Sequence, residues 1–294
     1  MTLSALGELL LLGAIWGASF LFIKIGVSDI RPLTFATLRV LVGSVVLLGV
    51  IALKRLPLPR GKRLWGRLAV MGAVGIVIPF GAIAWGTQYI ASGLSAILNA
   101  TMPLFTFGLA VLLGDEPLSL RRVLGLVVGF LGIMVLTWPK LQAGIRSEVW
   151  GQVAVIAASL SYAAAILYAK RYLAQEPPLL TAFGQVSMGC ALLVPLALAE
   201  LPWQQTFTPR VIGSVLAIGV IGTAMAYILY YRLLREIGPT ATSLVTYIVP
   251  LFGIFWGRII LAEILSWHAF VALALIFLSL ILVNGLPQTK RSRR

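Results

Sequence analysis

Ten apolar stretches of membrane-spanning length, joined by short polar turns, constrain this 294-residue chain more than any other feature. A helix needs about 20 apolar residues to cross the hydrocarbon core of a bilayer. Measured against that length, the sequence predicts helices near residues 5–26, 33–53, 67–86, 92–113, 121–139, 150–170, 180–200, 211–231, 239–260 and 266–285. The predicted fold class is therefore an all-α polytopic membrane protein with ten transmembrane helices.

The composition supports a membrane protein and argues against a nucleic-acid partner. Hydrophobic residues make up 60% of the chain, charged residues make up 11%, and the mean hydropathy is +1.01. Soluble domains carry about 25% charged residues. The net charge of +14 comes from basic residues between and beside the apolar runs, where they report membrane orientation and contact with anionic lipids.

Several kinds of site are excluded by missing residue types. Cys190 is the only cysteine, so no disulfide can form within the chain, and His268 is the only histidine, which removes His-based metal sites and Ser/His/Asp triads. The chain also has no GxxxxGKS or GxxxxGKT loop for ATP. We therefore predict no catalytic residue, no metal and no cofactor. The N-terminus carries Glu8 and no basic residue before the first apolar run, so we expect that run to be retained.

Lysine and arginine are distributed unevenly between the loops, and this predicts the orientation. With the N-terminus inside, sixteen basic residues are cytoplasmic, namely Lys54, Arg55, Arg60, Lys62, Arg63, Arg67, Arg121, Arg122, Lys170, Arg171, Arg232, Arg235, Lys290, Arg291, Arg293 and Arg294. Six lie on the other side, namely Lys24, Arg31, Lys140, Arg146, Arg210 and Arg258. We expect both termini in the cytoplasm, with residues 289–294 as a basic tail.

An internal repeat divides the chain into two units of five helices, expected at 1–140 and 150–288. The stretch from Ala91 to Glu116 resembles that from Gly238 to Glu263 at an offset of 147. The first helix aligns with the sixth at an offset of 146, which pairs Gly13 with Ser159, Trp16 with Tyr162 and Lys24 with Lys170. Because five is odd, the second unit must enter the membrane upside down relative to the first, as in the inverted repeats of secondary transporters.

Three motifs carry a resemblance to a known family. They are Gly13-Ala14-Ile15-Trp16-Gly17-Ala18-Ser19-Phe20, Leu94-Ser95-Ala96 followed by Pro103, and Gly-Asp-Glu-Pro at 114–117. With the ten helices in two units, they make the chain resemble the EamA family of the drug/metabolite transporter (DMT) superfamily. Within it, the chain is similar to bacterial amino-acid exporters of the YddG kind, which implies neutral or aromatic amino acids as substrates. The resemblance also implies two EamA-like units, a bacterial inner (plasma) membrane location, and a cavity lined by helices 1–4 and 6–9.

A transporter of this kind is expected to bind its substrate in a central cavity between the units. Polar and aromatic candidates on the lining helices are Trp16, Arg39, Trp85, Gln88, Tyr89, Ser95, Asn99, Thr101, Ser159, Tyr162, Gln185, Tyr227, Thr242, Thr246 and Tyr247. The aromatic residues could instead form interfacial belts, and the hydroxyls could bond their own backbone or join helices. Asn99 is the hardest to explain without a cavity, because an amide is costly in lipid.

Arg39 is the one basic residue clearly inside a predicted span. It is either a bidentate anchor for a substrate carboxylate or a side chain that snorkels to the lipid headgroups. Its repeat counterpart is Gln185, so the fold itself does not demand a charge there.

Prolines and glycines mark helix kinks and contacts. Pro103 and Pro250 fall inside the predicted fourth and ninth helices, as hinge or gate points or as kinks that only set shape. Gly125, Gly129 and Gly132 place small residues at packing spacing on the fifth helix, for a contact within the chain or a homodimer.

Every acidic residue maps to a loop or a helix end, whereas proton-coupled carriers usually keep a carboxylate within the membrane. We therefore predict facilitated or exchange-type movement. The leading hypothesis is a secondary transporter that exports amino acids or similar small metabolites by alternating access. The first alternative is an exporter or flippase for sugars, nucleotide sugars or drugs. A polytopic membrane transferase would need clustered acidic residues or a histidine at the membrane surface, and Asp115-Glu116 is the only adjacent acidic pair, so we expect no enzyme. The inverted repeat argues against the permease subunit of an ATP-driven complex.

Overall fold

The computed structural model describes residues 3–117, 119–142, 146–242 and 245–284. These residues form helices and no strand. The first unit contains α1 (Leu3–Gly26), α2 (Pro32–Leu53), α3 (Lys62–Gly72), the π-helix η1 (Ala73–Val77), α4 (Ile78–Tyr89), α5 (Ser92–Asn99), α6 (Met102–Leu112) and α7 (Leu120–Gln142). The second contains α8 (Ser147–Tyr172), α9 (Pro178–Ala199), the short 3-10 helix η2 (Pro202–Gln204), α10 (Pro209–Gly219), the π-helix η3 (Val220–Met225), α11 (Ala226–Thr242), α12 (Val245–Leu261) and α13 (Trp267–Asn284).

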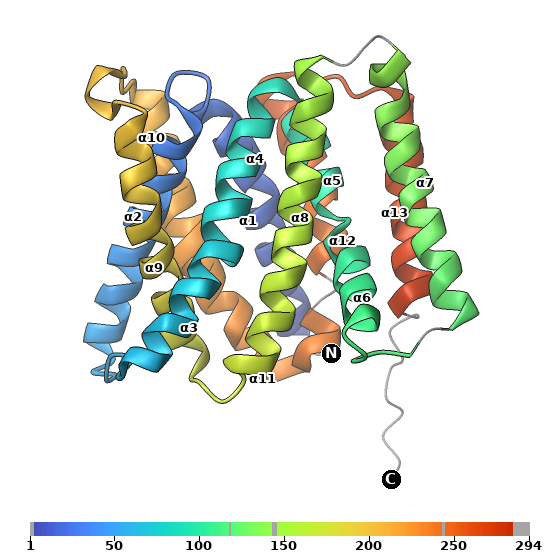
Figure 1. Ribbon diagram of the computed structural model, residues 1–294. Helices are drawn as coiled ribbons and strands as arrows, with labels where there is room; N and C mark the ends of the chain where they lie inside the picture. The colour runs from blue at the N-terminus through green and yellow to red at the C-terminus, as the bar shows by residue number, and fades with distance from the viewer. Residues whose placement is uncertain (1–2, 118, 143–145, 243–244, 285–294) are drawn as a thin grey trace.

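The prediction of an all-α polytopic membrane protein is confirmed. Within the described residues, eight helical segments are long and apolar enough to cross a membrane, and two shorter apolar helices occupy the ninth and tenth predicted spans. In Figure 1, α1 begins at the lower face whereas α8, its counterpart, begins at the upper face. The two units therefore cross in opposite senses, as inverted repeats do.

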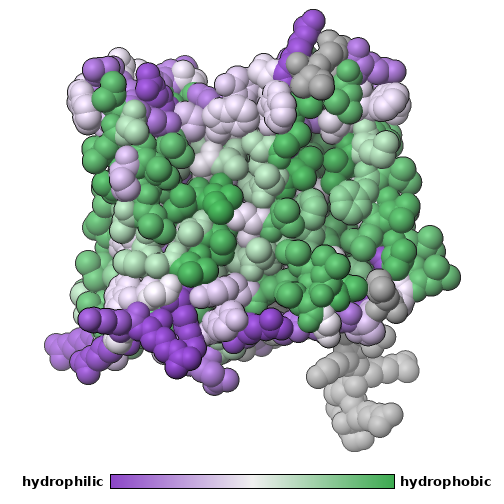
Figure 2. Space-filling model, in the orientation of Figure 1, coloured by the Kyte–Doolittle hydropathy of each residue, from purple (hydrophilic) through white to green (hydrophobic). Residues whose placement is uncertain are grey.

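The molecular surface has the layered polarity of a membrane protein. Figure 2 shows a broad apolar band with hydrophilic side chains above and below it, most densely at the lower left. Large apolar side chains in this band face outward, among them Leu124, Phe130 and Leu131 on α7. Such an exposed band would be unfavourable in water and is favourable against lipid chains.

The structure corrects several predicted helix limits, and the third helix begins at Lys62, five residues before its predicted start. The predicted loop at 232–238 is helical, because α11 continues to Thr242. Charged residues suggested a loop, but Arg232 and Glu236 form an i,i+4 ion pair at 2.9 Å that supports the helix. The predicted fourth helix is broken at Ala100 and Thr101, so Pro103 lies in the first turn of α6, where its missing N–H costs no hydrogen bond. Pro250 does lie inside a helix, α12.

The glycine face of α7 packs against α13 within the same chain, and these two helices stand together at one side of the bundle (Figure 1). A Cβ added at Gly125 would lie 2.7 Å from Val283 Cγ2, and one at Gly132 would lie 3.2 Å from the Ala272 oxygen. Only residues without a side chain allow this approach. The glycine face is therefore occupied, and a homodimer would need another surface.

Candidate functional site

A cavity of about 240 Å³ lies at the centre of the bundle, lined by both units. Its walls come from α1, α2, α4 and the α5–α6 break in the first unit, and from α8, η3, α11 and α12 in the second. The polar and aromatic lining residues are Trp16, Ser19, Phe20, Arg39, Phe80, Asn99, Tyr162, Tyr227, Tyr230 and Thr246.

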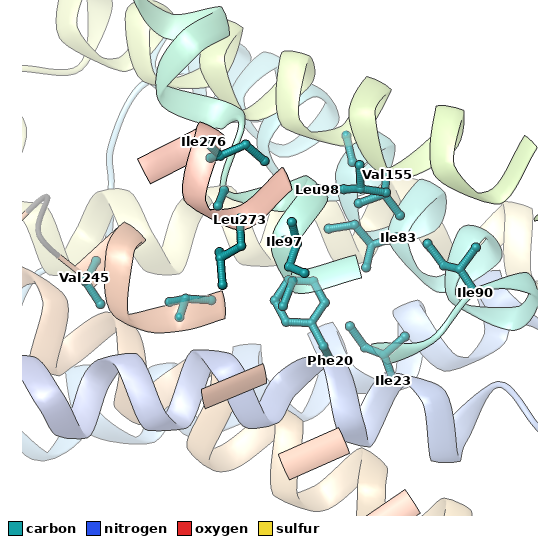
Figure 3. Close-up of a cluster of buried hydrophobic side chains, with 14 of the residues drawn as sticks. Phe20, Ile23, Ile83, Ile90, Ile97, Leu98, Val155, Val245, Leu273 and Ile276 are labelled. Atoms are coloured by element: carbon teal, nitrogen blue, oxygen red, sulfur yellow. The ribbon is translucent and has the colours of Figure 1, made fainter. Parts of the chain in front are cut away.

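The wall of the cavity nearer the upper face is formed by packed apolar side chains. Phe20 and Ile23 of α1 and Ile83 of α4 line the cavity and also belong to the main buried cluster. Figure 3 shows them gathered with Ile97 of α5, and Ile90 lies beyond them. This cluster therefore lies between the cavity-lining residues and Ile90, near the upper end of α4.

Arg39 is buried in the cavity wall, with 8% of its surface exposed. Its Nε donates to Thr223 Oγ1 at 3.1 Å, and its guanidinium carbon lies 3.9 Å from the centroid of the Phe80 ring. A side chain held in this way does not reach the membrane surface, so the snorkelling alternative is wrong. No ion pair between Arg39 and a carboxylate is present in the described residues.

The π-helix η3 places the hydroxyl that Arg39 contacts. Thr223 Oγ1 donates to the Ile218 oxygen at 2.9 Å, five residues back, and this leaves its lone pairs free to accept from Arg39. The first unit has a matching π-helix, η1, offset by 147 from η3, and Ser161 Oγ donates to its Val74 oxygen at 2.6 Å. π-Helical turns are frequent at functional sites.

Asn99 is the last residue of α5 and lies where the helix breaks beside the cavity. Its Oδ1 is buried and accepts no hydrogen bond from any group in the described residues. The neighbouring Leu98 oxygen is instead well satisfied, since it accepts from Thr101 Oγ1 at 2.6 Å and from Ser159 Oγ at 3.3 Å. A buried acceptor without a donor is costly and points to a ligand donor that fills the place.

The remaining wall is aromatic. The Trp16 and Tyr230 rings lie 5.5 Å apart, and Phe80 meets Tyr162 edge-on at 6.4 Å. Such faces suit an apolar or aromatic side chain of a ligand, or a cation above a ring.

Of the residues predicted from sequence, Trp16, Arg39, Asn99, Tyr162, Tyr227 and Thr246 line this cavity. Sequence reasoning missed Ser19, Phe20, Phe80 and Tyr230. The phenylalanines carry no polar group that separates them from core residues. Tyr230 could have been found, because it lies one helical turn after Tyr227.

The other predicted residues lie outside the cavity. Trp85 and Tyr89 pair edge-on at 5.0 Å near the upper end of α4 and are 39% and 38% exposed, as belt aromatics are. Helix-joining contacts are made by Gln88 to the Val27 oxygen, by Ser95 to Thr87, and by Ser159 to the Leu98 oxygen. Thr101 instead bonds its own backbone, because its Oγ1 donates to the Leu98 oxygen three residues back. Gln185 and Thr242 are buried, and Tyr247 packs on Phe277 at 5.7 Å.

Charged groups hold the upper end of the bundle together. Lys24 Nζ donates to the oxygens of Thr87, Gln88 and Ile90 at 2.8–3.1 Å, at the end of α4. The Glu263 carboxylate accepts from the Ser92 and Gly93 backbone N–H groups at 2.7 and 3.1 Å, at the start of α5. We call these contacts of Lys24 and Glu263 the upper lock.

The lower end is held more loosely. Arg232 of α11 pairs with Glu8 of α1 at 3.0 Å. Asp115, after α6, pairs with Lys170 and Arg171 of α8 at 3.5 and 3.4 Å, and both basic side chains are at least half exposed. Exposed pairs of this length contribute little to stability.

Comparisons with known proteins agree with this architecture. The model of the EamA-like transporter family matches residues 4–138 and 149–285. The chain is 27% identical over 282 residues to an uncharacterized inner membrane transporter of Escherichia coli K12, YedA, covering 95% of this chain and 90% of that protein. It is 24% identical over 250 residues to an uncharacterized transporter of Bacillus subtilis, YoaV, covering 85% and 86% of the two chains. A solved crystal structure with 16% identity aligns with a TM-score of 0.66 over 95% of this chain and 96% of that one, which shows the fold alone.

Proposed function

This chain belongs to the EamA-like transporter family, and we propose that it exports neutral or aromatic amino acids, or similar small metabolites, by alternating access. The observation that carries the proposal is a buried cation, Arg39, that faces a central cavity and pairs with no carboxylate among the described residues. An uncompensated charge at this depth is expensive. It is explained if the substrate supplies the anion.

The cavity offers one group for each part of a free amino acid. The substrate carboxylate binds the Arg39 guanidinium, whose Nη atoms can take it in a bidentate pair while Nε stays on Thr223. The substrate ammonium donates to Asn99 Oδ1, which accepts no hydrogen bond from the described residues. The side chain packs against the rings of Trp16, Phe80 and Tyr162.

The volume and the charge of the central cavity disfavour drugs and nucleotide sugars as substrates. A volume of about 240 Å³ is below the roughly 300–1,000 Å³ of pockets for drug-sized ligands. Nucleotide sugars carry two phosphates, and Arg39 is the one basic side chain among the lining residues that the structure describes. A small zwitterion or monoanion therefore fits better.

Alternating access follows from the inverted units. The observed conformation has its upper lock formed, and the transport cycle opens this lock while the lower contacts tighten. The π-helices η1 and η3, at matched places in the two units, and the α5–α6 break before Pro103 are the proposed hinges, with Pro250 in the second unit. The excess of basic residues at the lower face supports a cytoplasmic position for that face in a bacterial inner membrane.

No carboxylate is among the described residues that line the cavity. A proton-coupled mechanism would need such a group or another titratable relay at the site. The proposal is therefore facilitated or exchange-type movement down the gradient of the substrate.

Flux measurements in proteoliposomes test the proposal. A labelled panel of neutral, basic and acidic amino acids is offered with and without a pH gradient. We expect saturable movement of neutral or aromatic members that does not depend on the pH gradient and is weakened by Asn99→Ala. The matched control is Gln142→Ala, an exposed amide at the end of α7 and outside the cavity, which should leave transport unchanged. Absence of amino-acid flux in a folded preparation would reject this substrate class.

A further inference from the structure

A second cavity, of about 510 Å³, lies at the lower face and is separate from the central one. It is formed by the connection between α2 and α3, the first turns of α3, and the region where α9 begins. Arg60, Arg63 and Arg67 line it together with Leu64, Leu180 and a single acidic residue, Glu176.

The arginines of this cavity are poorly compensated. Within the described residues, Arg60 and Arg63 make no ion pair and no side-chain hydrogen bond, and both are exposed. Arg67 Nη1 donates to the backbone oxygen of Tyr172 at 3.1 Å. Three guanidinium groups around one cavity repel each other, and Glu176 offsets only one of them. The side chains that line the cavity therefore carry a net positive charge.

The start of α3 adds to the positive potential. Its N-cap, Gly61, has no side chain to accept from the free N–H groups, and the first turn contains no acidic residue. The positive end of the helix dipole therefore lies among Arg60, Lys62 and Arg63, which is the reverse of the favourable arrangement.

The inverted repeat supplies an internal comparison. The counterpart of α3 is α10, whose first residue is offset by 147 and whose N-cap is Thr208. Thr208 Oγ1 accepts from the Val211 N–H at 3.4 Å and donates to Asp29 Oδ2 at 2.8 Å. The upper-face helix start is thus provided with a protein anion, whereas no carboxylate among the described residues bonds the backbone at the start of α3.

We propose that this cavity binds the phosphate of an anionic phospholipid from the leaflet at the lower face. The phosphate takes charge-assisted hydrogen bonds from Arg60 and Arg63 and from the free N–H groups of α3. Leu64 and Leu180 provide an apolar wall for the glycerol and upper acyl chain. A free phosphate would use the same polar groups. The lipid is favoured because the hydrophilic surface at the lower left of Figure 2, where Figure 1 places the connection between α2 and α3, lies directly beneath the apolar band.

The test measures thermal unfolding of the purified full chain in detergent with added phosphatidylglycerol, phosphatidylcholine of the same chains, or sodium phosphate. A ligand that binds the folded state raises the unfolding midpoint. We expect phosphatidylglycerol alone to raise it. Arg60→Gln/Arg63→Gln should require about 30-fold more of this lipid for the same rise, at about tenfold per 1.4 kcal/mol and about 1 kcal/mol per basic residue.

The control variant is Lys54→Gln/Arg55→Gln, which removes two positive charges from the same connection at positions outside the cavity. Its unfolding midpoint should rise with phosphatidylglycerol as that of the unchanged protein does. Equal weakening in both variants would mean diffuse attraction and overturn the site. Equal protection by phosphatidylcholine would overturn the role of the anion. Equal protection by sodium phosphate at the same concentration would overturn the lipid as its source.

Discussion

Replacement of Arg39 by glutamine tests whether this residue anchors the substrate or only stabilises the fold. The second unit already accepts glutamine at this place, because Gln185 is buried against η1 as Arg39 is against η3. A Cβ added at Gly75 of η1 would lie 3.9 Å from Gln185 Oε1, and Arg39 Nε donates to Thr223 of η3. The change removes one charge-assisted hydrogen bond and one cation–π contact, about 2 kcal/mol each. It also removes a buried unpaired charge, which costs several kcal/mol.

These opposing contributions predict an unfolding midpoint of the substrate-free variant within about 4 °C of the unchanged protein, or above it. Transport behaves differently, because the two hydrogen bonds of a bidentate carboxylate pair contribute about 1.5 kcal/mol each or more. We expect kcat/KM to fall by at least about 100-fold.

Initial rates of amino-acid flux in proteoliposomes and thermal unfolding in detergent are measured on the same preparations. Arg210→Gln is the control, since that arginine is exposed in α10 and lies away from the cavity. Transport by Arg39→Gln within threefold of the unchanged protein would refute the anchor. A midpoint lowered by 10 °C or more would show instead that Arg39 holds the fold.

Three further predictions concern other groups. Asn99→Leu removes the acceptor for the substrate ammonium, so the apparent affinity for an amino acid should fall about tenfold. The affinity for the desamino analogue of that amino acid should be unchanged. Equal losses for both ligands would contradict the role of Asn99 as the ammonium acceptor. Lys24→Met removes the hydrogen bonds of Lys24 and opens the upper lock. A cysteine introduced at Ile23 in a Cys190→Ala background should then react at least about tenfold faster with an impermeant thiol reagent added on the side of the upper face. An unchanged rate would argue against the lock. Gly17→Ala should destabilise the bundle by about 1–3 kcal/mol, because its Cβ would lie 2.6 Å from Phe252 Cβ of α12. The control is Gly49→Ala, whose Cβ would meet no atom within 4 Å and should be tolerated. Equal unfolding midpoints of the two variants would refute the close packing of α1 on α12.

The sequence predicted the fold class because in a membrane the number and length of apolar runs decide which segments span the bilayer. It also predicted the two units, since Asn99 and Pro103 have counterparts in Thr246 and Pro250 at a constant offset. The ends of the helices were harder to predict from the sequence. The last part of α11, for example, contains charged residues of the kind that are also common in loops. The mid-span position of Arg39 and Asn99 marked them as candidates, since polar groups there are costly without a partner.

The tertiary structure decided which candidates share a cavity. Trp85, Tyr89 and Ser95 have the same residue types and helical setting as the residues that line it, yet the first two lie at the bundle end and the third bonds Thr87. A helix presents polar groups on every side, and its rotation is set by contacts such as the close approach of Gly17 to α12, which join residues far apart in the chain. The sequence by itself therefore determined the spans, their inverted arrangement and the unusual charge of Arg39. Packing alone determined that Arg39 contacts Phe80 and Thr223 and that it shares a cavity with Asn99, because the direction of a side chain depends on neighbours that local sequence does not specify.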